Sequence, residues 1–562
     1  MAARQAGAPR GAPVGAPRGA PRGGARPTLG AVPRHLLTRL SGAAATLFLA
    51  AFLAVPLAVI VGRSLTPAPG EAFGAGFLAA LVDPYYLGRI AFTLLQALLS
   101  TALTVALGLP TALLLARYAF RGKRALTAAF TVPFVMPTVV AGIGFLALVG
   151  PRGALGVDLR DTLAVVLLAH VFYNFAVVAR VVSGFLAGVA PRLEEAAATL
   201  GATERRTLWR VTLPLALPAT LASALLVFLF CFTSFGVIVI LAPAARFATL
   251  EVEIYRLTAR LLEVDAAAAL ALVQLVLMVG LGFLYTRLQE RLAVSVTPGD
   301  AARAPRGGAR ALVGVTLLAT GALVLAPLVA LAARSFAAPG ADWPSLGNYA
   351  RLLAPSTTVG FTGLWPALRN SLAFAVGSAG LALFIGFLFA HAVARGGWRW
   401  LDQASLLPLA TSPVTLAFGY LLTYPLLVGS AWGVPLAHAL LAFPFVTRTL
   451  LPAYRAQPPA LADAAATLGA GPLRTLLRVE LPLLAPATAT AFAFAFAVSM
   501  GEFGATLLLV RPEYATLPVA IFDRLGRPGA ANYGEALALA VVLMVITAVV
   551  MLVLQRRGRG EF

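Results

Sequence analysis

The chain of 562 residues is 60% hydrophobic and only 12% charged, whereas soluble domains are about 45–50% apolar, so its composition excludes a soluble globular protein. The formal net charge of +21 could indicate a nucleic-acid partner, but the arginines lie between long apolar segments, as in the loops of membrane proteins, and we expect no nucleic-acid partner. The single cysteine, Cys231, excludes a disulfide framework and a cysteine-based metal site.

The first 42 residues repeat the tetrapeptide Gly-Ala-Pro-Arg and contain no acidic residue. This segment is too long and too rich in Pro and Gly for a signal peptide. We therefore predict that residues 1–42 form a disordered basic tail on the cytoplasmic side. Binding to a lipid surface is the alternative role for such a tail.

Apolar stretches of about 20 residues or more, enough to cross a hydrocarbon core of ~30 Å as a helix, recur along the rest of the chain. They predict an all-α integral membrane protein with twelve transmembrane helices in two halves, 43–286 and 311–554. A linker at 287–310 joins the halves, and a short tail at 555–562 follows them. The predicted spans are 43–62, 90–116, 126–149, 162–188, 214–242 and 265–286, then 311–332, 370–394, 402–428, 434–454, 482–510 and 534–554.

The basic residues indicate which side of the membrane each loop faces. The two tails and the loops on their side of the membrane hold 28 Lys and Arg residues, whereas the loops on the other side hold 13. Because cytoplasmic loops collect basic residues, we expect both termini in the cytoplasm. Arg180 and Arg448, near the cytoplasmic ends of their spans, are predicted to snorkel to the interface or cap a loop helix; substrate contact is the alternative.

The two halves are copies of one another. A shift of 268 residues aligns them without a gap over about 65 residues, placing Ala-Thr-Leu-Gly-Ala at 198–202 on the same motif at 466–470 and His170 on His438. Because each half has an even number of spans, both copies enter the membrane in the same orientation. We therefore predict two parallel six-helix repeats with a central path between them.

The cytoplasmic loops predicted at 190–213 and 455–481 carry the strongest motif. The first contains E-A-A-A-T-L-G-A from Glu195, and the second contains D-A-A-A-T-L-G-A from Asp463. Alanines favour a helix with a smooth face, and a glycine allows the left-handed turn that ends it. A single copy could be an ordinary helical connector, but two copies in register on one side of the membrane favour a shared function.

The motif resembles the E-A-A loop of binding-protein-dependent ABC importer permeases, with Asp463 in place of Glu. The resemblance implies a type I ABC importer permease fold and a docking site for a separate ATPase on each loop. It also implies that the chain forms the pathway in a bacterial inner membrane, with two copies of the ATPase subunit, an extracytoplasmic substrate-binding protein and the lipid bilayer as partners. The implied docking residues are Glu195, Ala196, Ala197, Gly201, Asp463, Ala464, Ala465 and Gly469.

The chain has no ATP-binding motif of its own. A Walker A motif requires Gly-Lys followed by Ser or Thr, and Arg124 follows Lys123, the only lysine. We therefore expect a transport subunit that is not an enzyme and binds no cofactor, with ATP on the partner ATPase.

Other segments bear on the substrate. Residues 169–175, 231–236 and 248–255 are similar to the fused permease of the bacterial thiamine importer. Residues 501–506 and 516–521 are shared more widely, including with ferric-iron and molybdate permeases. The resemblance favours thiamine as the substrate, with ferric iron or another ion as the alternative.

Two equivalent tripeptides are candidates for a gate or for the substrate path. Glu502 is the one acid that we place deep inside a span, where a carboxylate marks a functional candidate. It could attract a cation, but the wide occurrence of G-E-F-G favours a gating or helix–helix hydrogen bond. The candidate residues are Ser234, Phe235, Gly236, Glu502, Phe503 and Gly504.

No metal site is predicted, because His170 and His438 have no second His, Cys or acid three or four residues further on; we expect both to pack between helices. A twelve-span secondary transporter would also have two parallel halves, but such carriers commonly bear a G-x-x-x-D-R-like loop where this chain has R-Y-A-F-R-G-K-R. A membrane-embedded enzyme would need clustered polar groups at depth, and the spans contain only scattered ones.

Overall fold

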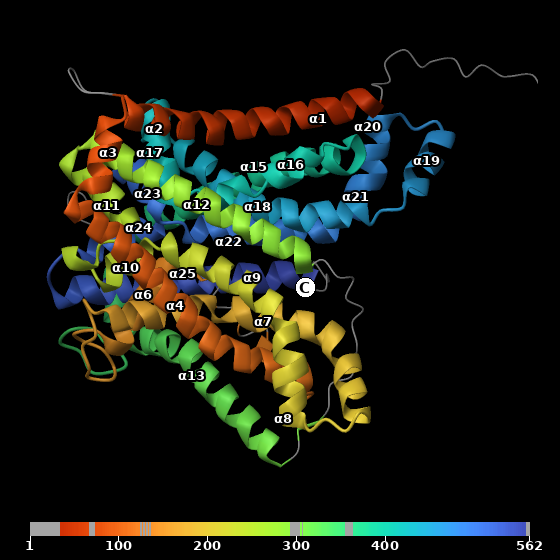
Figure 1. Cartoon of the computed structure of the whole chain (residues 1–562). Coiled ribbons are helices and arrows are strands. Elements are labelled where there is room, and N and C mark those ends of the chain that lie inside the picture. Colours follow the sequence, from red (N-terminus) through yellow and green to blue (C-terminus); the bar gives the residue numbers. More distant parts are fainter. Residues whose placement is uncertain are drawn as a thin grey trace, which may run out of the picture.

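The computed structural model describes residues 34–66, 73–123, 136–292, 307–354 and 363–557, together with a few isolated positions between 123 and 136 and between 303 and 307. The elements in these ranges are all helices, packed as one elongated bundle (Figure 1).

Nine helices of the described residues are long and apolar enough to cross a membrane, or up to eleven if each of two bent pairs is counted as one span. Helices α1 (Arg34–Leu49) and α2 (Val55–Leu65) continue into each other through a π-helical turn, and α8 (Glu204–Thr207) continues likewise into α9 (Leu213–Phe232). The others are α4 (Pro84–Arg117), α7 (Leu163–Thr199), α12 (Val264–Leu292), α13 (Gly308–Ser335), α15 (Leu364–Gly396), α18 (Gly433–Arg455) and α25 (Ala530–Arg557).

The third predicted span of each half is not one straight helix. In the first half only α6 (Thr138–Val149) is a helix of the predicted 126–149, and most of 124–135 lies outside the described residues. In the second half, α16 (Arg399–Ala404) and a 3-10 turn are separated by a sharp bend from α17 (Pro413–Thr423). Both α6 and α17 begin at a proline, Pro137 or Pro413, and proline disfavours a helical conformation of the residue before it.

The fifth predicted span of each half is also broken, which the sequence did not predict. The segment 214–242 is α9 followed by α10 (Gly236–Leu241), and 482–510 is α21 (Leu481–Leu483), α22 (Ala485–Gly501) and α23 (Gly504–Leu509). A neighbouring helix takes the space beside each break. A Cβ atom on Gly236 would lie 2.6 Å from Thr138 Oγ1 of α6, and one on Gly504 would lie 3.1 Å from Val414 Cγ2 of α17.

Some element boundaries also differ from those predicted. Helix α1 already begins at Arg34, so residues 34–42 are helical and the predicted tail is shorter; residues 1–33 lie outside the described part. Helix α7 runs on to Thr199, into the predicted loop 190–213. Short helices that the span analysis missed are α3 (Ala75–Val82), α11 (Leu250–Arg256), α14 (Gly347–Leu353) and α24 (Leu517–Leu525).

The internal duplication holds at the level of individual elements. Helix α8 and α20 (Pro472–Thr475) are 268 residues apart, and so are the π-helical segments Leu208–Thr212 and Leu476–Glu480 that follow them. Helices α10 and α23 show the same spacing. The shift that aligns the sequences therefore also aligns the helix breaks.

The first long helix of each half packs against the other half. Helix α1 packs on α15, and Ser41 Oγ lies 3.0 Å from Nδ1 of the buried His391. Helix α13 packs on α6 and α25. At two equivalent crossings a glycine permits the contact: a Cβ atom on Gly144 would lie 3.1 Å from the Pro327 carbonyl oxygen, and one on Gly419 would lie 2.9 Å from Pro56 Cβ.

The two ends of the bundle differ. The segments around α8 and around α19 (Pro459–Thr467) and α20 project from one end, where α1 begins and α25 ends (Figure 1). We call this the docking end. Helices α3, α11 and α24 lie at the opposite end (Figure 1).

Candidate functional site

The helix breaks bring the two predicted tripeptides together at the interface of the halves. Phe235, between α9 and α10, and Phe503, between α22 and α23, have ring centroids 5.6 Å apart. Both side chains are nearly inaccessible to solvent. Two residues 268 positions apart in the sequence therefore meet across the pseudo-twofold axis.

Two further rings extend this contact. The Tyr255 ring of α11 lies 5.3 Å from the Phe235 ring, and the Phe522 ring of α24 lies 5.2 Å from the Phe503 ring. We call these four residues the aromatic plug. Because α11 and α24 follow equivalent helices, the plug has the same pseudo-symmetry as the bundle. A chain of packed rings blocks passage between the halves in this conformation.

A buried histidine supports each break. His170 lies 2.8 Å from Ser100 of α4 through Nδ1 and 2.8 Å from Ser234 through Nε2. His438 Nδ1 lies 2.8 Å from Ser499 Oγ on α22. These contacts agree with the predicted packing role of the histidines. Within the described ranges, no group of three or more His, Cys, Asp or Glu side chains could hold a metal ion.

Glu502 occupies the position that corresponds to Ser234. Its carboxylate accepts hydrogen bonds from the backbone N–H groups of Ala505 at 2.9 Å and Thr506 at 3.0 Å, which caps α23. His438 Nε2 lies 3.0 Å from the same carboxylate. These contacts agree with the hydrogen-bonding role that was favoured over a substrate ligand.

Two further buried acids lie on α11. Glu253 pairs with Arg256 at 3.3 Å and accepts a hydrogen bond from Tyr85 Oη at 3.2 Å. Neither oxygen of the fully buried Glu251 carboxylate has a hydrogen-bond partner among the described residues. Glu502 is thus not the one acid at depth. The segment 248–255 was noted for its resemblance, but its sequence did not indicate that it folds back between the halves.

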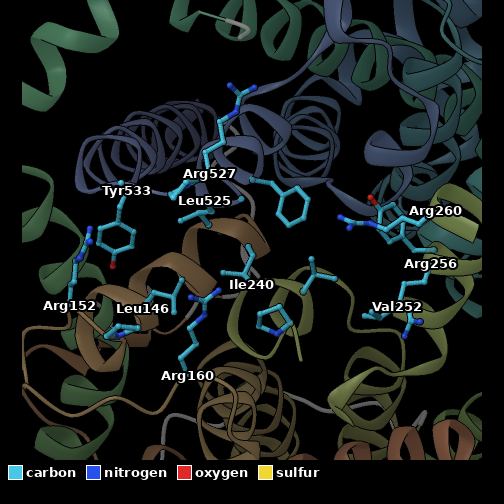
Figure 2. Close-up of a pocket in the computed structure, with 18 residues that line it drawn as sticks. Leu146, Arg152, Arg160, Ile240, Val252, Arg256, Arg260, Leu525, Arg527 and Tyr533 are labelled. Carbon is cyan, nitrogen blue, oxygen red and sulfur yellow. The ribbon is translucent and has the colours of Figure 1, made fainter. Parts of the chain in front are cut away.

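A pocket of about 690 Å³ lies between the halves at the end opposite the docking end. Leu146 of α6, Ile240 of α10 and Val252 of α11 line it from the first half, and Leu525 of α24 and Tyr533 of α25 line it from the second (Figure 2). The plug residues Tyr255 and Phe522 also face the pocket. The pocket is therefore the compartment next to the aromatic plug.

The docking segments have the predicted turn geometry. Gly201 has φ +76° and Gly469 has φ +78°, so the left-handed conformation predicted for both is confirmed. Each glycine N–H donates to a carbonyl three residues back, and the N–H of the next residue donates to a carbonyl five residues back, which is the Schellman arrangement that ends a helix. A Cβ atom on either glycine would meet no other group within 4 Å.

The predicted docking residues lie on exposed surface. Glu195 and Ala196 are exposed in the last turns of α7, and Asp463 and Ala464 are exposed on α19. Ala197 and Ala465 are half-buried. Beside the two glycines, the side chains of Leu200 and Leu468 are 87% and 88% exposed, so each segment ends in an unusually exposed apolar side chain.

An ion pair fixes each docking segment to the bundle, but the acid differs between the halves. In the first half Glu194, just before the motif, pairs with Arg117 of α4 at 3.1 Å and accepts a hydrogen bond from Thr212 at 2.7 Å. In the second half Arg395 of α15 pairs at 3.4 Å with Glu480, which stands at the position equivalent to Thr212. Sequence reasoning missed both pairs because their partners lie far apart in the chain.

Arg448 forms a further ion pair at this end. Its guanidinium lies 3.7 Å from the carboxylate of Asp402 on α16, which also pairs with Arg455 at 3.0 Å. This position is consistent with the interfacial role predicted for Arg448.

Comparison with known proteins agrees with this geometry. The chain matches the family described as "Binding-protein-dependent transport system inner membrane component" twice, over residues 108–296 and 382–557, which together make up more than half of its length. The two matches correspond to the two repeats.

Individual relatives cover most of the chain. It is 28% identical over 543 residues to the thiamine transport system permease protein ThiP of Brucella abortus strain 2308, covering 90% of this chain and 94% of the relative. It is 27% identical over 469 residues to the protein of the same name from Escherichia coli K12, covering 80% and 85%. A putative 2-aminoethylphosphonate transport system permease protein of Salmonella typhimurium is 34% identical over 199 residues, covering 34% and 74%.

The family match confirms the resemblance predicted from the E-A-A motif and the type I ABC importer permease fold with two repeats. It assigns the chain to a multi-pass transport subunit of the inner membrane that is not an enzyme and works with an ATPase and a substrate-binding protein. The chain belongs to the binding-protein-dependent transport system inner membrane components, as a fused permease of an ABC importer.

Proposed function

We propose that this permease imports thiamine through a path between its two halves and that the aromatic plug gates this path. Support for the substrate comes from the relatives named thiamine transport permeases, which align with up to 90% of the chain. Support for the gate comes from the equivalent breaks that bring Phe235 and Phe503 into contact.

We further propose that each docking segment receives one copy of the ATPase. The observation that carries this proposal is the pair of exposed Schellman turns at Gly201 and Gly469, which lie at the same end of the bundle. Each turn presents an exposed leucine, Leu200 or Leu468, that a groove on a partner could bury. Two equivalent sites imply a stoichiometry of two ATPase copies to one permease.

Substitution of these glycines tests the docking proposal. A β-branched residue in the left-handed conformation costs roughly 1–2 kcal/mol or more, so Gly201→Val and Gly469→Val should displace the docking segments without unfolding the spans. We expect normal insertion, reduced co-purification of the ATPase and weak uptake of labelled thiamine in proteoliposomes that contain the binding protein and ATPase.

Gly340 provides a matched control. It also has a positive φ, +74°, and a Cβ atom there would meet nothing within 4 Å, but it lies in the loop between α13 and α14, outside the docking segments. Gly340→Val should retain ATPase binding and uptake. Wild-type ATPase binding, hydrolysis and uptake in both Gly201→Val and Gly469→Val would refute the docking assignment.

We propose that the docking end faces the cytoplasm and that both termini are therefore cytoplasmic. The excess of basic residues in the loops on this side, 28 against 13, supports this orientation. A reporter that is active only outside the cytoplasm, fused after Phe562, should be silent. Strong reporter activity would reverse the proposed topology.

A further inference from the structure

The pocket beside the aromatic plug is strongly basic. Among its 18 lining residues there is no aspartate or glutamate. The guanidinium groups come from the loop after α6, from α11 and the turn that follows it, and from the loop after α24, so both halves contribute them. The basic lining residues are Arg152, Arg160, Arg256, Arg260 and Arg527.

Only two of these arginines have a carboxylate partner. Arg256 pairs with Glu253 at 3.3 Å, and Arg527 pairs with Asp523 at 3.3 Å. In Figure 2 the Arg527 side chain points away from the other labelled arginines. The arginines that form no ion pair with any described residue are Arg152, Arg160 and Arg260.

Nearby acids do not neutralise this charge. Asp158 Oδ1 accepts a hydrogen bond from the backbone N–H of Arg160 at 2.9 Å, and Asp161 Oδ1 accepts one from the backbone N–H of Ala244 at 2.9 Å. Neither aspartate lines the pocket. The pocket therefore presents an excess of positive charge to any molecule that enters it.

The rest of the lining is apolar and aromatic. Tyr255, Phe522 and Tyr533 each present a ring, and Arg152 lies over the Tyr533 ring with its guanidinium carbon 5.9 Å from the ring centroid. A volume of about 690 Å³ falls within the range of roughly 300–1,000 Å³ found for small-ligand sites. The size and lining fit a molecule with an apolar or aromatic body and an anionic group.

We propose that this pocket is a binding site for a small molecule that carries a phosphate-type oxyanion, held by Arg152, Arg160 and Arg260. Guanidinium groups bind phosphate and phosphonate oxygens through paired, charge-assisted hydrogen bonds. A cation without such a group is disfavoured by the same charges. Because Tyr255 and Phe522 line the pocket and pack on Phe235 and Phe503, the site precedes the gate. This inference rests on the proposed transport path.

Two probes that differ only in a phosphate group test the charge requirement. The full-length permease would be purified with its ATPase, placed in nanodiscs of zwitterionic lipid, and titrated by calorimetry with thiamine monophosphate, thiamine and inorganic phosphate. We expect the phosphate ester to bind at least about tenfold more tightly than thiamine and inorganic phosphate to compete with the ester. Added salt should weaken binding of the ester.

Substitutions locate the site. Arg160→Gln with Arg260→Gln should lower the affinity for thiamine monophosphate about tenfold or more and leave the weak binding of thiamine unchanged. Arg369→Gln is the control, because Arg369 is exposed on α15 outside the pocket lining. Equal binding of the ester and thiamine, or ester binding that the double substitution leaves unchanged, would overturn the proposal.

Two outcomes separate this inference from other failures. If the ester does not bind while thiamine uptake with the binding protein and ATPase is normal, the oxyanion site is wrong and the proposed function stands. If the double substitution instead abolishes only docking of the binding protein, the arginines serve an acidic protein surface, and the small-molecule proposal is overturned. Loss of thiamine uptake by the unaltered complex would refute the proposed function itself.

Discussion

Glu502 shows how a charged side chain is accommodated inside this membrane protein. Its carboxylate caps the first turn of α23 and contacts His438, and its side chain is only 7% exposed. An isolated carboxylate at this depth would be expensive, but here hydrogen bonds satisfy both of its oxygens. By contrast, the oxygens of Glu251 have no hydrogen-bond partner among the described residues. The two buried acids are therefore in different environments.

The first prediction concerns the charge of Glu502. Glu502→Gln keeps an oxygen that can cap α23, so we expect substantial thiamine uptake. Glu502→Ala removes the cap, which typically costs about 0.5–2 kcal/mol, and should lower both the unfolding temperature and uptake. Uptake in proteoliposomes and thermal unfolding distinguish the two variants. If Glu502→Gln abolished uptake while assembly and ATP hydrolysis stayed normal, a direct role for the charge in the path would be the better explanation.

At the scale of elements, the broken fifth helix of each half is the central device. Each break turns the chain so that Phe235 and Phe503 project into the interface between the halves, and α11 and α24 add Tyr255 and Phe522. Neighbouring rings in such pairs attract one another by about 0.5–1.5 kcal/mol beyond the burial of their area. The plug is therefore a set of weak, equivalent contacts that a shift of one half could open.

The second prediction is that the plug prevents leakage. Phe235→Ala and Phe503→Ala should each allow loaded proteoliposomes to release thiamine without ATP, and the double variant should release it faster. Phe389→Ala is the control, because Phe389 packs against Phe443 within the second half, 5.4 Å between ring centroids. That substitution should lower stability by roughly 3–5 kcal/mol without raising the ATP-independent leak. Intact membranes in the double plug variant would contradict the gate assignment.

The docking segments are tied down differently in the two halves. In the first half the acid of the ion pair, Glu194, lies on the docking helix itself. In the second half the acid, Glu480, lies beyond the docking segment, and it also accepts a hydrogen bond from Tyr454. In addition α19 is separate from α18, whereas α7 continues into the first docking segment. The two segments therefore differ in what holds the docking helix.

The third prediction follows from this difference. Arg117→Ala should raise amide hydrogen exchange across residues 193–202, because the docking helix of the first half loses its ion pair. Arg395→Ala should instead raise exchange around Glu480 and leave 459–470 close to the unmodified protein. Exchange measured by mass spectrometry on the complex without nucleotide tests both. Equal loosening of the two docking helices would show that the position of the acid does not matter.

These elements also show what the sequence could and could not predict. The left-handed turns at Gly201 and Gly469 were predictable, because a Schellman turn depends on a few consecutive residues. The breaks before Gly236 and Gly504 were not, because each adjoins a helix that approaches from a distant part of the chain. The partnership of Phe235 with Phe503 followed only as sequence equivalence, and their contact required the arrangement of the halves.

For the whole molecule, the two halves are interlocked and not simply placed side by side. Helix α1 of the first half packs on α15 of the second, and α13 of the second packs on α6 of the first. Helix packing in membranes relies on small residues that let backbones approach closely. Gly144 and Gly419 are such residues at equivalent crossings, against Pro327 and Pro56 respectively.

The last prediction tests this interlocking. A Cβ atom at Gly144 would lie 3.1 Å from a backbone oxygen, and one at Gly419 would lie 2.9 Å from a proline Cβ, so neither contact can relax by rotating a flexible side chain. Gly144→Ala and Gly419→Ala should each push a first helix away from the opposite half and lower the unfolding temperature in detergent. Because the crossings are equivalent, we expect decreases of similar size.

Gly377 is the control for helix propensity. It lies within α15, and a Cβ atom there would meet nothing within 4 Å. Gly377→Ala should leave stability unchanged or raise it by up to about 1 kcal/mol, since glycine is the weaker helix former. If Gly144→Ala and Gly419→Ala behaved like Gly377→Ala, close approach at these crossings would not hold the halves together, and the remaining contacts of α1 and α13 would have to suffice.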